Sequence, residues 1–108
     1  MPDAVYVVAQ IQVKDLQKYV VEYGLPTFEI FKRFEGEVLA ATPAAETIEG
    51  EWFGNWTVIV RYPNAERAKE LHECPEYAEL KRARIERLSD GGNLAIVPAF
   101  DPKQKPKT

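Results

Sequence analysis

With 108 residues, the chain is long enough for one domain with a modest core, and it leaves little surface for a deep enclosed pocket. Lys and Arg number 14 against 17 for Asp and Glu, and the resulting net charge of -3 argues against a nucleic-acid partner. A single cysteine excludes an internal disulfide, and neither a signal-peptide pattern nor an apolar run of membrane-spanning length is present in the sequence. We therefore expect a cytoplasmic protein without a membrane partner.

Residues 4–13 predict a strand whose two faces differ in character. Alternate positions place five apolar side chains on one face: Val5, Val7, Ala9, Ile11 and Val13. The opposite face carries Tyr6 and Val8 together with two glutamines, which is typical of neither a solvated surface nor a dry core. We interpret this mixed face as one that a partner subunit covers or that lines a damp cavity.

A helix is predicted next, with Asp15 as its N-cap, because a carboxylate can accept the free backbone N–H groups of a first helical turn. An apolar stripe at spacings of three and four follows and includes Tyr23. Gly24 and Pro26 interrupt the stripe, and proline has no backbone N–H to donate. We expect a kink or a split there, either to wrap the helix over a twisted sheet or to open space for a ligand beside Tyr23.

Two further strands are predicted at residues 37–42 and 55–62, separated by a long polar connection at 43–54. The connection carries Glu49, which could act as a general base if partial burial raised the pKa of its carboxyl group. The alternative for Glu49 is the ordinary one for a loop residue, a solvated side chain.

The last third of the chain predicts a pair of helices and a final strand. Asn64 is a suitable N-cap for a short helix, and Pro75 opens the next helix at the position that proline favours. The tripeptide Asp90-Gly91-Gly92 is expected to end that helix, and residues 93–99 are expected to form the last strand.

The element order is strand, helix, strand, strand, helix pair, strand, in a single domain at residues 1–100. This order predicts an α+β fold of the ferredoxin-like βαββαβ type, with a four-stranded antiparallel sheet and helices on one face. The other face stays bare, and an apolar patch of that size favours a homodimer in which two sheet faces meet as a dimeric α/β barrel. Residues 101–108 have almost no apolar content and are expected to be disordered.

Arg84 is the strongest candidate for a ligand contact, because it falls on the inward apolar stripe of the second helix of the pair. One interpretation is a structural ion pair with Glu49 or Asp15. The other is a clamp for a substrate carboxylate or enolate, which a planar guanidinium suits well. A buried acid against Arg84 would favour the first interpretation, and an unpaired Arg84 beside Tyr23 or Tyr77 would favour the second.

The remaining candidates are weaker. Tyr23 and Tyr77 could donate hydroxyl hydrogen bonds to a ligand, although aromatic residues at helical spacing more often belong to the core. His72 and Cys74 lie two residues apart and point in different directions on a helix, so we interpret them as packing or capping residues rather than a nucleophile and its base. One His and one Cys fall short of a zinc or iron site, and no cofactor is predicted.

Four segments carry a family resemblance: YVVAQIQVKD at the start, EGEVLA after the first helix, IEGEW in the long connection and CPEYAELKRAR at the helix pair. In this order, from about Tyr6 to about Pro98, they resemble the domain-of-unknown-function family numbered 1330 of the dimeric α/β-barrel superfamily. The chain departs from the usual family pattern at Glu35, where glycine is usual, and at Cys74, where serine is usual. It retains Pro75, Glu76, Tyr77 and Arg84.

The resemblance implies a ferredoxin-like dimer with its site between the sheet and the helices. Superfamily members include cofactor-free oxygenases, isomerases, haem-binding enzymes and ligand-sensing domains. We expect a small homodimeric, cofactor-independent enzyme of oxygenase or isomerase type that acts on a small organic acid or phenolic compound; the alternative is a non-catalytic small-molecule binding or sensing module. The expected catalytic residues are Arg84 and Glu49, and the expected ligand-binding residues are Tyr23, Tyr77 and Asp15.

Overall fold

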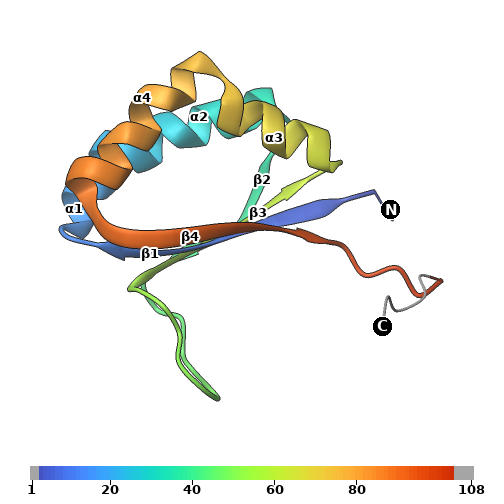
Figure 1. The fold of residues 1–108 in the computed structure, drawn as a ribbon, viewed down its shortest axis with the longest axis horizontal. Helices are drawn as coiled ribbons and strands as arrows, with labels where there is room; N and C mark the ends of the chain where they lie inside the picture. The colour runs from blue at the N-terminus through green and yellow to red at the C-terminus, as the bar shows by residue number, and fades with distance from the viewer. Residues whose placement is uncertain (1–2, 104–108) are drawn as a thin grey trace.

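The structure is a computed structural model that describes residues 3–103. Four strands form one antiparallel sheet in the order β2-β3-β1-β4, with β1 at Val5–Val13, β2 at Glu37–Thr42, β3 at Trp56–Tyr62 and β4 at Ser89–Pro98. The helices lie on one side of the sheet, and the connection between β2 and β3 extends from the other side (Figure 1). The predicted α+β, ferredoxin-like arrangement of the subunit is thereby confirmed.

Two helical regions cover the sheet, and each combines α-helical and π-helical segments. The first consists of α1 (Leu16–Tyr19), the π-helical segment η1 (Val20–Gly24) and α2 (Leu25–Arg33). The second consists of α3 (Ala65–Glu73), α4 (Pro75–Ala83) and the π-helical segment η2 (Arg84–Leu88). Within residues 3–103, no helix is long and apolar enough to cross a membrane. Disorder is predicted from the sequence for residues 101–108, of which residues 104–108 lie outside the described part of the chain.

The interruption predicted at Gly24 and Pro26 takes the form of η1. There the backbone N–H of Leu25 donates to the carbonyl of Val20, five residues back instead of four. Pro26 then lies in the first turn of α2, the part of a helix that proline favours. The helical region therefore stays continuous while its side chains shift by one position relative to a regular α-helix.

The second helical region starts as predicted and ends differently. Cys74 has extended backbone angles (φ -74°, ψ 145°) that end α3, and Pro75 begins α4. The helix ends at Leu88, not at Asp90-Gly91-Gly92, because Ser89 is already extended and belongs to β4. The expected helix stop was wrong: Gly91, at φ 106°, lies at a register shift of β4 against β1, where the strand carries one extra residue.

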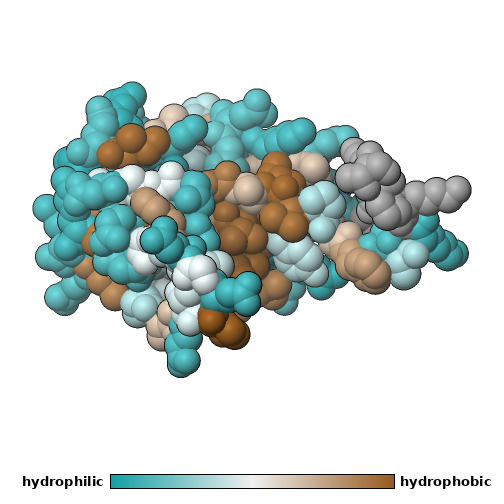
Figure 2. All heavy atoms as spheres, turned by 60° about the horizontal axis from the view of Figure 1, so that its bottom comes forward, coloured by the Kyte–Doolittle hydropathy of each residue, from teal (hydrophilic) through white to brown (hydrophobic). Residues whose placement is uncertain are grey.

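The alternation predicted for the first strand is confirmed by β1, in which every odd residue is buried beneath the helices. The even residues form a face without helices, together with apolar neighbours from the adjacent strands: Tyr6, Val8, Leu39, Ile59 and Val97. We call these five residues the open-face patch. Figure 2 shows hydrophobic atoms gathered across this side of the molecule.

The connection between β2 and β3 is anchored at its end to β1. Gly54, at φ 78°, approaches the Ile11 carbonyl so closely that a Cβ there would lie 2.4 Å from its oxygen. The Asn55 side chain accepts from the Val13 N–H at 2.7 Å and donates to the Val13 carbonyl at 3.0 Å. These contacts fix the base of the connection, while its middle, including Glu49, is exposed.

Candidate functional site

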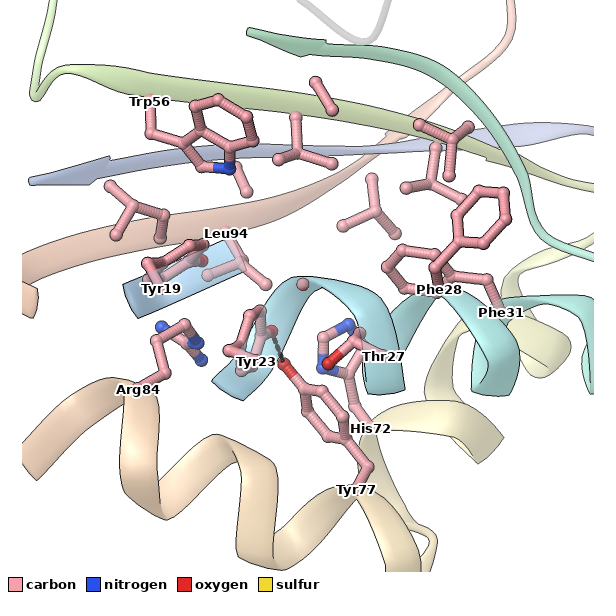
Figure 3. Close-up of a pocket in the computed structure, with 18 of the residues that line it drawn as sticks. Tyr19, Tyr23, Thr27, Phe28, Phe31, Trp56, His72, Tyr77, Arg84 and Leu94 are labelled. Atoms are coloured by element: carbon pink, nitrogen blue, oxygen red, sulfur yellow. Dashed lines mark hydrogen bonds between the residues drawn. The ribbon is translucent and has the colours of Figure 1, made fainter. Parts of the chain in front are cut away.

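A cavity of about 100 Å³ lies between the helix-covered face of the sheet and the helical regions. The sheet contributes mainly apolar walls, which include Val7, Ala9, Trp56, Val58 and Leu94. The helices contribute nearly all of the polar groups: Tyr19, Tyr23, Thr27, His72, Tyr77 and Arg84 (Figure 3). An apolar space with a few convergent polar groups is the usual form of a small-molecule site.

Three tyrosines meet at the centre of the cavity. The hydroxyl groups of Tyr23 and Tyr77 form a hydrogen bond between the two helical regions, and the Tyr19 ring lies 5.0 Å from the Tyr23 ring (Figure 3). Burial raises the pKa of Tyr19 and of Tyr23, and the neighbouring Tyr77 raises that of Tyr23 further. These phenols therefore keep their protons at neutral pH and act as hydrogen-bond donors.

Arg84 is buried, with 6% of its surface exposed, and forms no ion pair with any acid between residues 3 and 103. Its guanidinium carbon lies 5.7 Å from the centre of the Tyr23 ring, in cation–π range. Burial acts to lower the pKa of Arg84, but the net shift is upward, and a guanidinium keeps its proton in proteins, so the side chain stays charged. A buried cation that lacks a carboxylate is unusual and is available to an anionic ligand.

The alternative ion pairs are absent because both acids lie elsewhere. The Asp15 carboxylate accepts the Lys18 backbone N–H at 3.1 Å as the N-cap of α1. Glu49 is exposed in the connection between β2 and β3 and does not line the cavity. Of the five residues proposed from the sequence, the fold thus brings Tyr23, Tyr77 and Arg84 together and leaves the two carboxylates outside.

The two π-helical segments carry the key polar residues of the cavity. Tyr23 belongs to η1, and Arg84 is the first residue of η2. A π-helical segment adds one residue to a turn and so re-aims the side chains that it contains, which is why such segments recur at functional sites. Pro26 gives a sequence signal for the first segment, and no comparable signal precedes the second.

Three buried polar atoms at the cavity have no hydrogen-bond partner among residues 3–103: Thr27 Oγ1, Tyr62 Oη and Arg84 Nε. An unsatisfied buried polar group costs about 1–3 kcal/mol, so native proteins rarely keep several of them together without a ligand or water to bind. Sequence patterns did not single out Thr27 or Tyr62, because each is one position among many on an apolar stripe. Only the folded arrangement brings them to the same cavity.

His72 also lines the cavity, although its position on a short helix indicated a packing role. Its ring meets the Tyr77 ring edge-on with centres 5.2 Å apart. Burial lowers the pKa of His72, and the positive charges of Lys81 and Arg84 lower it further, so the imidazole is neutral at neutral pH. A neutral imidazole can accept a proton from a ligand.

Cys74 lies outside the cavity. It is half-buried and packs against the core, and its side chain forms no capping hydrogen bond with α4. Among residues 3–103, no group of three or more His, Cys, Asp or Glu side chains could hold a metal ion.

Solved structures of similar fold include proteins of unknown function and a cofactor-independent oxygenase. A protein of unknown function from Rhodopseudomonas palustris, RPA0582, is 16% identical, with a TM-score of 0.73 over 94% of this chain and 86% of that chain. SnoaB, a cofactor-independent oxygenase from Streptomyces nogalater, is 16% identical, with a TM-score of 0.66 over 95% and 99% of the two chains. A dimeric ferredoxin-like protein from Bacteroides fragilis is 11% identical, with a TM-score of 0.53 over 89% and 96%.

At these identities the similarity supports the fold alone. No curated protein matches the chain. A family model, by contrast, matches nearly its full length, at residues 4–100, and agrees with the resemblance found in the sequence. The chain therefore belongs to the family described as Domain of unknown function (DUF1330).

Proposed function

We propose that the protein binds a small apolar anion in the cavity and acts on it as a cofactor-independent enzyme, with a small organic acid or phenolic compound as substrate. One observation carries the proposal: Arg84 is buried without a carboxylate partner in a cavity where Thr27 and Tyr62 also have unsatisfied polar atoms. A ligand carboxylate or phenolate would supply the charge that Arg84 lacks.

The chemistry that these groups support is removal of a proton and stabilisation of the anion that results. Neutral His72 is the proton acceptor in this proposal, and Arg84 with the Tyr23 and Tyr77 hydroxyls stabilises the developing negative charge. An isomerase returns the proton to another carbon of the same molecule, whereas an oxygenase lets the carbanion react with dioxygen. The likeness to SnoaB in fold is compatible with the second outcome.

Glu49 remains a prediction as the catalytic base. It lies away from the cavity of its own subunit, in the connection that leaves the sheet on the open side (Figure 1). A role for Glu49 therefore requires the connection to reach the cavity of a partner subunit. The proposed homodimer forms through the open-face patch, whose apolar side chains are half-buried or exposed on the face without helices.

The first test is binding of a panel of small aryl and alkyl carboxylates and phenols, measured by calorimetry. Arg84→Gln should weaken binding about 10- to 150-fold, which corresponds to about 1.5–3 kcal/mol for a hydrogen bond to a charged group. Arg87→Gln is the matched control, because Arg87 belongs to the same segment but pairs with Glu22 on the surface at 2.9 Å. Equal affinities of the two variants would refute the proposed site.

Measurements of turnover distinguish the proposed enzyme from the second candidate function, a non-catalytic binding or sensing module. Oxygen uptake and exchange of ligand hydrogens with deuterated solvent should both be measured for every compound that binds. We expect His72→Gln to abolish exchange while binding persists, and Glu49→Gln to leave exchange unchanged; the reverse result would assign the base to Glu49. Binding without exchange or oxygen uptake by the unmodified protein would favour the sensing module.

A further inference from the structure

A second hollow adjoins the cavity at the β4 edge of the sheet. It has a volume of about 390 Å³. Four residues line both it and the cavity: Val7, His72, Arg84 and Leu94. Its outer walls are Lys69 of α3, Lys81 of α4 and residues 94–96 of β4. Because β4 is an edge strand, this hollow, which we call the vestibule, lies at the margin of the sheet.

The vestibule is positively charged in a protein whose net charge is -3. Lys69, Lys81 and Arg84 line it, and no Asp or Glu does. Neither lysine forms an ion pair with an acid in the described part of the chain, although most of the exposed arginines do. Several cations around one hollow, without neutralising carboxylates, attract and hold anions.

The opposite end of the cavity has the contrary character. There the lining includes Phe28 and Phe31, on the side of the cavity away from Arg84 (Figure 3). The whole space therefore runs from an apolar end, past the buried Arg84, to the cationic vestibule. A ligand that is complementary to this order of apolar and charged walls has an apolar body and more than one acidic group at one end.

We propose that the ligand is an apolar diacid, with its body in the cavity, one anionic group on Arg84 and a second between Lys69 and Lys81 in the vestibule. This inference rests on the proposed function and adds the number and position of the charges on the ligand. Arg84 belongs to both spaces, so a molecule held by its guanidinium extends naturally into the vestibule.

The probes for a test are hydrocinnamate and phenylsuccinate, which share one aromatic body and differ by a single carboxylate. Calorimetry should show that phenylsuccinate binds at least about tenfold more tightly, since each tenfold corresponds to about 1.4 kcal/mol. The double substitution Lys69→Gln and Lys81→Gln should remove this advantage and change hydrocinnamate binding by no more than about twofold. Arg84→Gln should weaken both probes.

A matched control removes the same charge elsewhere: Lys18→Gln with Lys32→Gln, two exposed lysines that do not line the vestibule. Equal affinity of the two probes for the unmodified protein, with Arg84→Gln weakening both, would overturn the diacid inference and leave the proposed function intact. Equal weakening of both probes by the Lys69 and Lys81 substitutions would also overturn it, because general attraction would then explain the effect. If neither probe binds, both proposals fail.

Discussion

The two faces of the sheet depart from ordinary burial rules in opposite directions. The face beneath the helices encloses polar atoms without partners in the described part of the chain, namely Thr27 Oγ1, Tyr62 Oη and Arg84 Nε. The open face exposes apolar side chains, among them Leu39 at 49% and Val97 at 43%. A buried polar group and an exposed apolar patch are the two observations about burial that carry information on function.

The difference indicates what each face lacks. Unsatisfied donors and acceptors in an enclosed space require a small polar or charged molecule, because only such a molecule can enter and restore the hydrogen bonds. Apolar side chains gathered on one face suit another apolar surface of similar size better than a small ligand. The proposed ligand on one side and the proposed second subunit on the other would satisfy both faces.

The largest expected effect follows a charge placed in the open-face patch. Val8 lies in the middle of β1, between Ile59 and Ala95 on the neighbouring strands. Val8→Glu should raise the dissociation constant of the proposed dimer by roughly 100-fold or more, because two-fold symmetry would bury two like charges at a cost of several kcal/mol. Size-exclusion chromatography with light scattering at micromolar concentration measures the change.

Val21→Glu is the control for this substitution, since Val21 is 59% exposed on the helical side of the molecule. It should leave the oligomeric state unchanged. A monomeric unmodified protein at that concentration, or equal dissociation by both variants, would show that the open face is not the interface.

The second prediction concerns the cavity face and separates stability from binding. Arg84→Met keeps the long side chain and removes the buried charge, so the free energy of unfolding should rise by about 1–3 kcal/mol. Anion binding should be lost in the same variant. Urea unfolding measures the first effect and calorimetry the second. A fall in stability of about 1 kcal/mol or more would mean that Arg84 stabilises the free protein and is not kept for a ligand.

The sequence predicts those features of the fold that depend on neighbouring residues better than those that depend on contacts between distant segments. The alternation of β1, the break at Pro26 and the helix start at Pro75 are local, since each follows from the stereochemistry of a few neighbouring residues. Gly91 shows the limit: glycine fits a helix end and a strand bulge equally well, and only the pairing of β4 with β1 selects the bulge.

The site is less predictable because it is assembled from distant segments. The inward position of Arg84 follows from helical periodicity, but its lack of an acidic partner depends on where Asp15 and Glu49 lie in space. Helix propensity does not distinguish α-helical from π-helical segments, so the re-aiming of Arg84 by η2 has no sequence signal. The exposure of Glu49 likewise depends on the path of the whole connection between β2 and β3.

The third prediction tests whether the unsatisfied hydroxyls are kept for a ligand. Thr27→Val replaces the buried Oγ1 by a methyl group of the same shape, which should raise the free energy of unfolding by about 1 kcal/mol in the absence of ligand. Thr57→Val is the contrasting variant, since the Thr57 hydroxyl accepts from Trp52 Nε1 at 3.0 Å and its loss should destabilise the protein. Equal losses in urea unfolding would mean that Thr27 already has a partner in the free protein.

The smallest expected effect is a dependence of stability on pH through His72, the single histidine of the chain. Burial, with the charges of Lys81 and Arg84, lowers its pKa in the folded protein below the ordinary value of about 6.5. The unfolded chain therefore binds the proton first as the pH falls, so stability decreases below about pH 6.5 until the folded protein is also protonated. His72→Gln should lose less stability than the unmodified protein between about pH 7 and about pH 5.5.

Lys81→Gln sharpens this test because it removes one of the charges that oppose protonation of His72 while it keeps the imidazole. The pKa of His72 should then lie closer to its ordinary value, and the loss of stability on acidification should become smaller than in the unmodified protein. Lys32→Gln, on α2 and paired with Glu29, should leave the pH dependence unchanged. If Lys81→Gln and Lys32→Gln behave alike in urea unfolding across this pH range, the cationic vestibule does not act on the cavity.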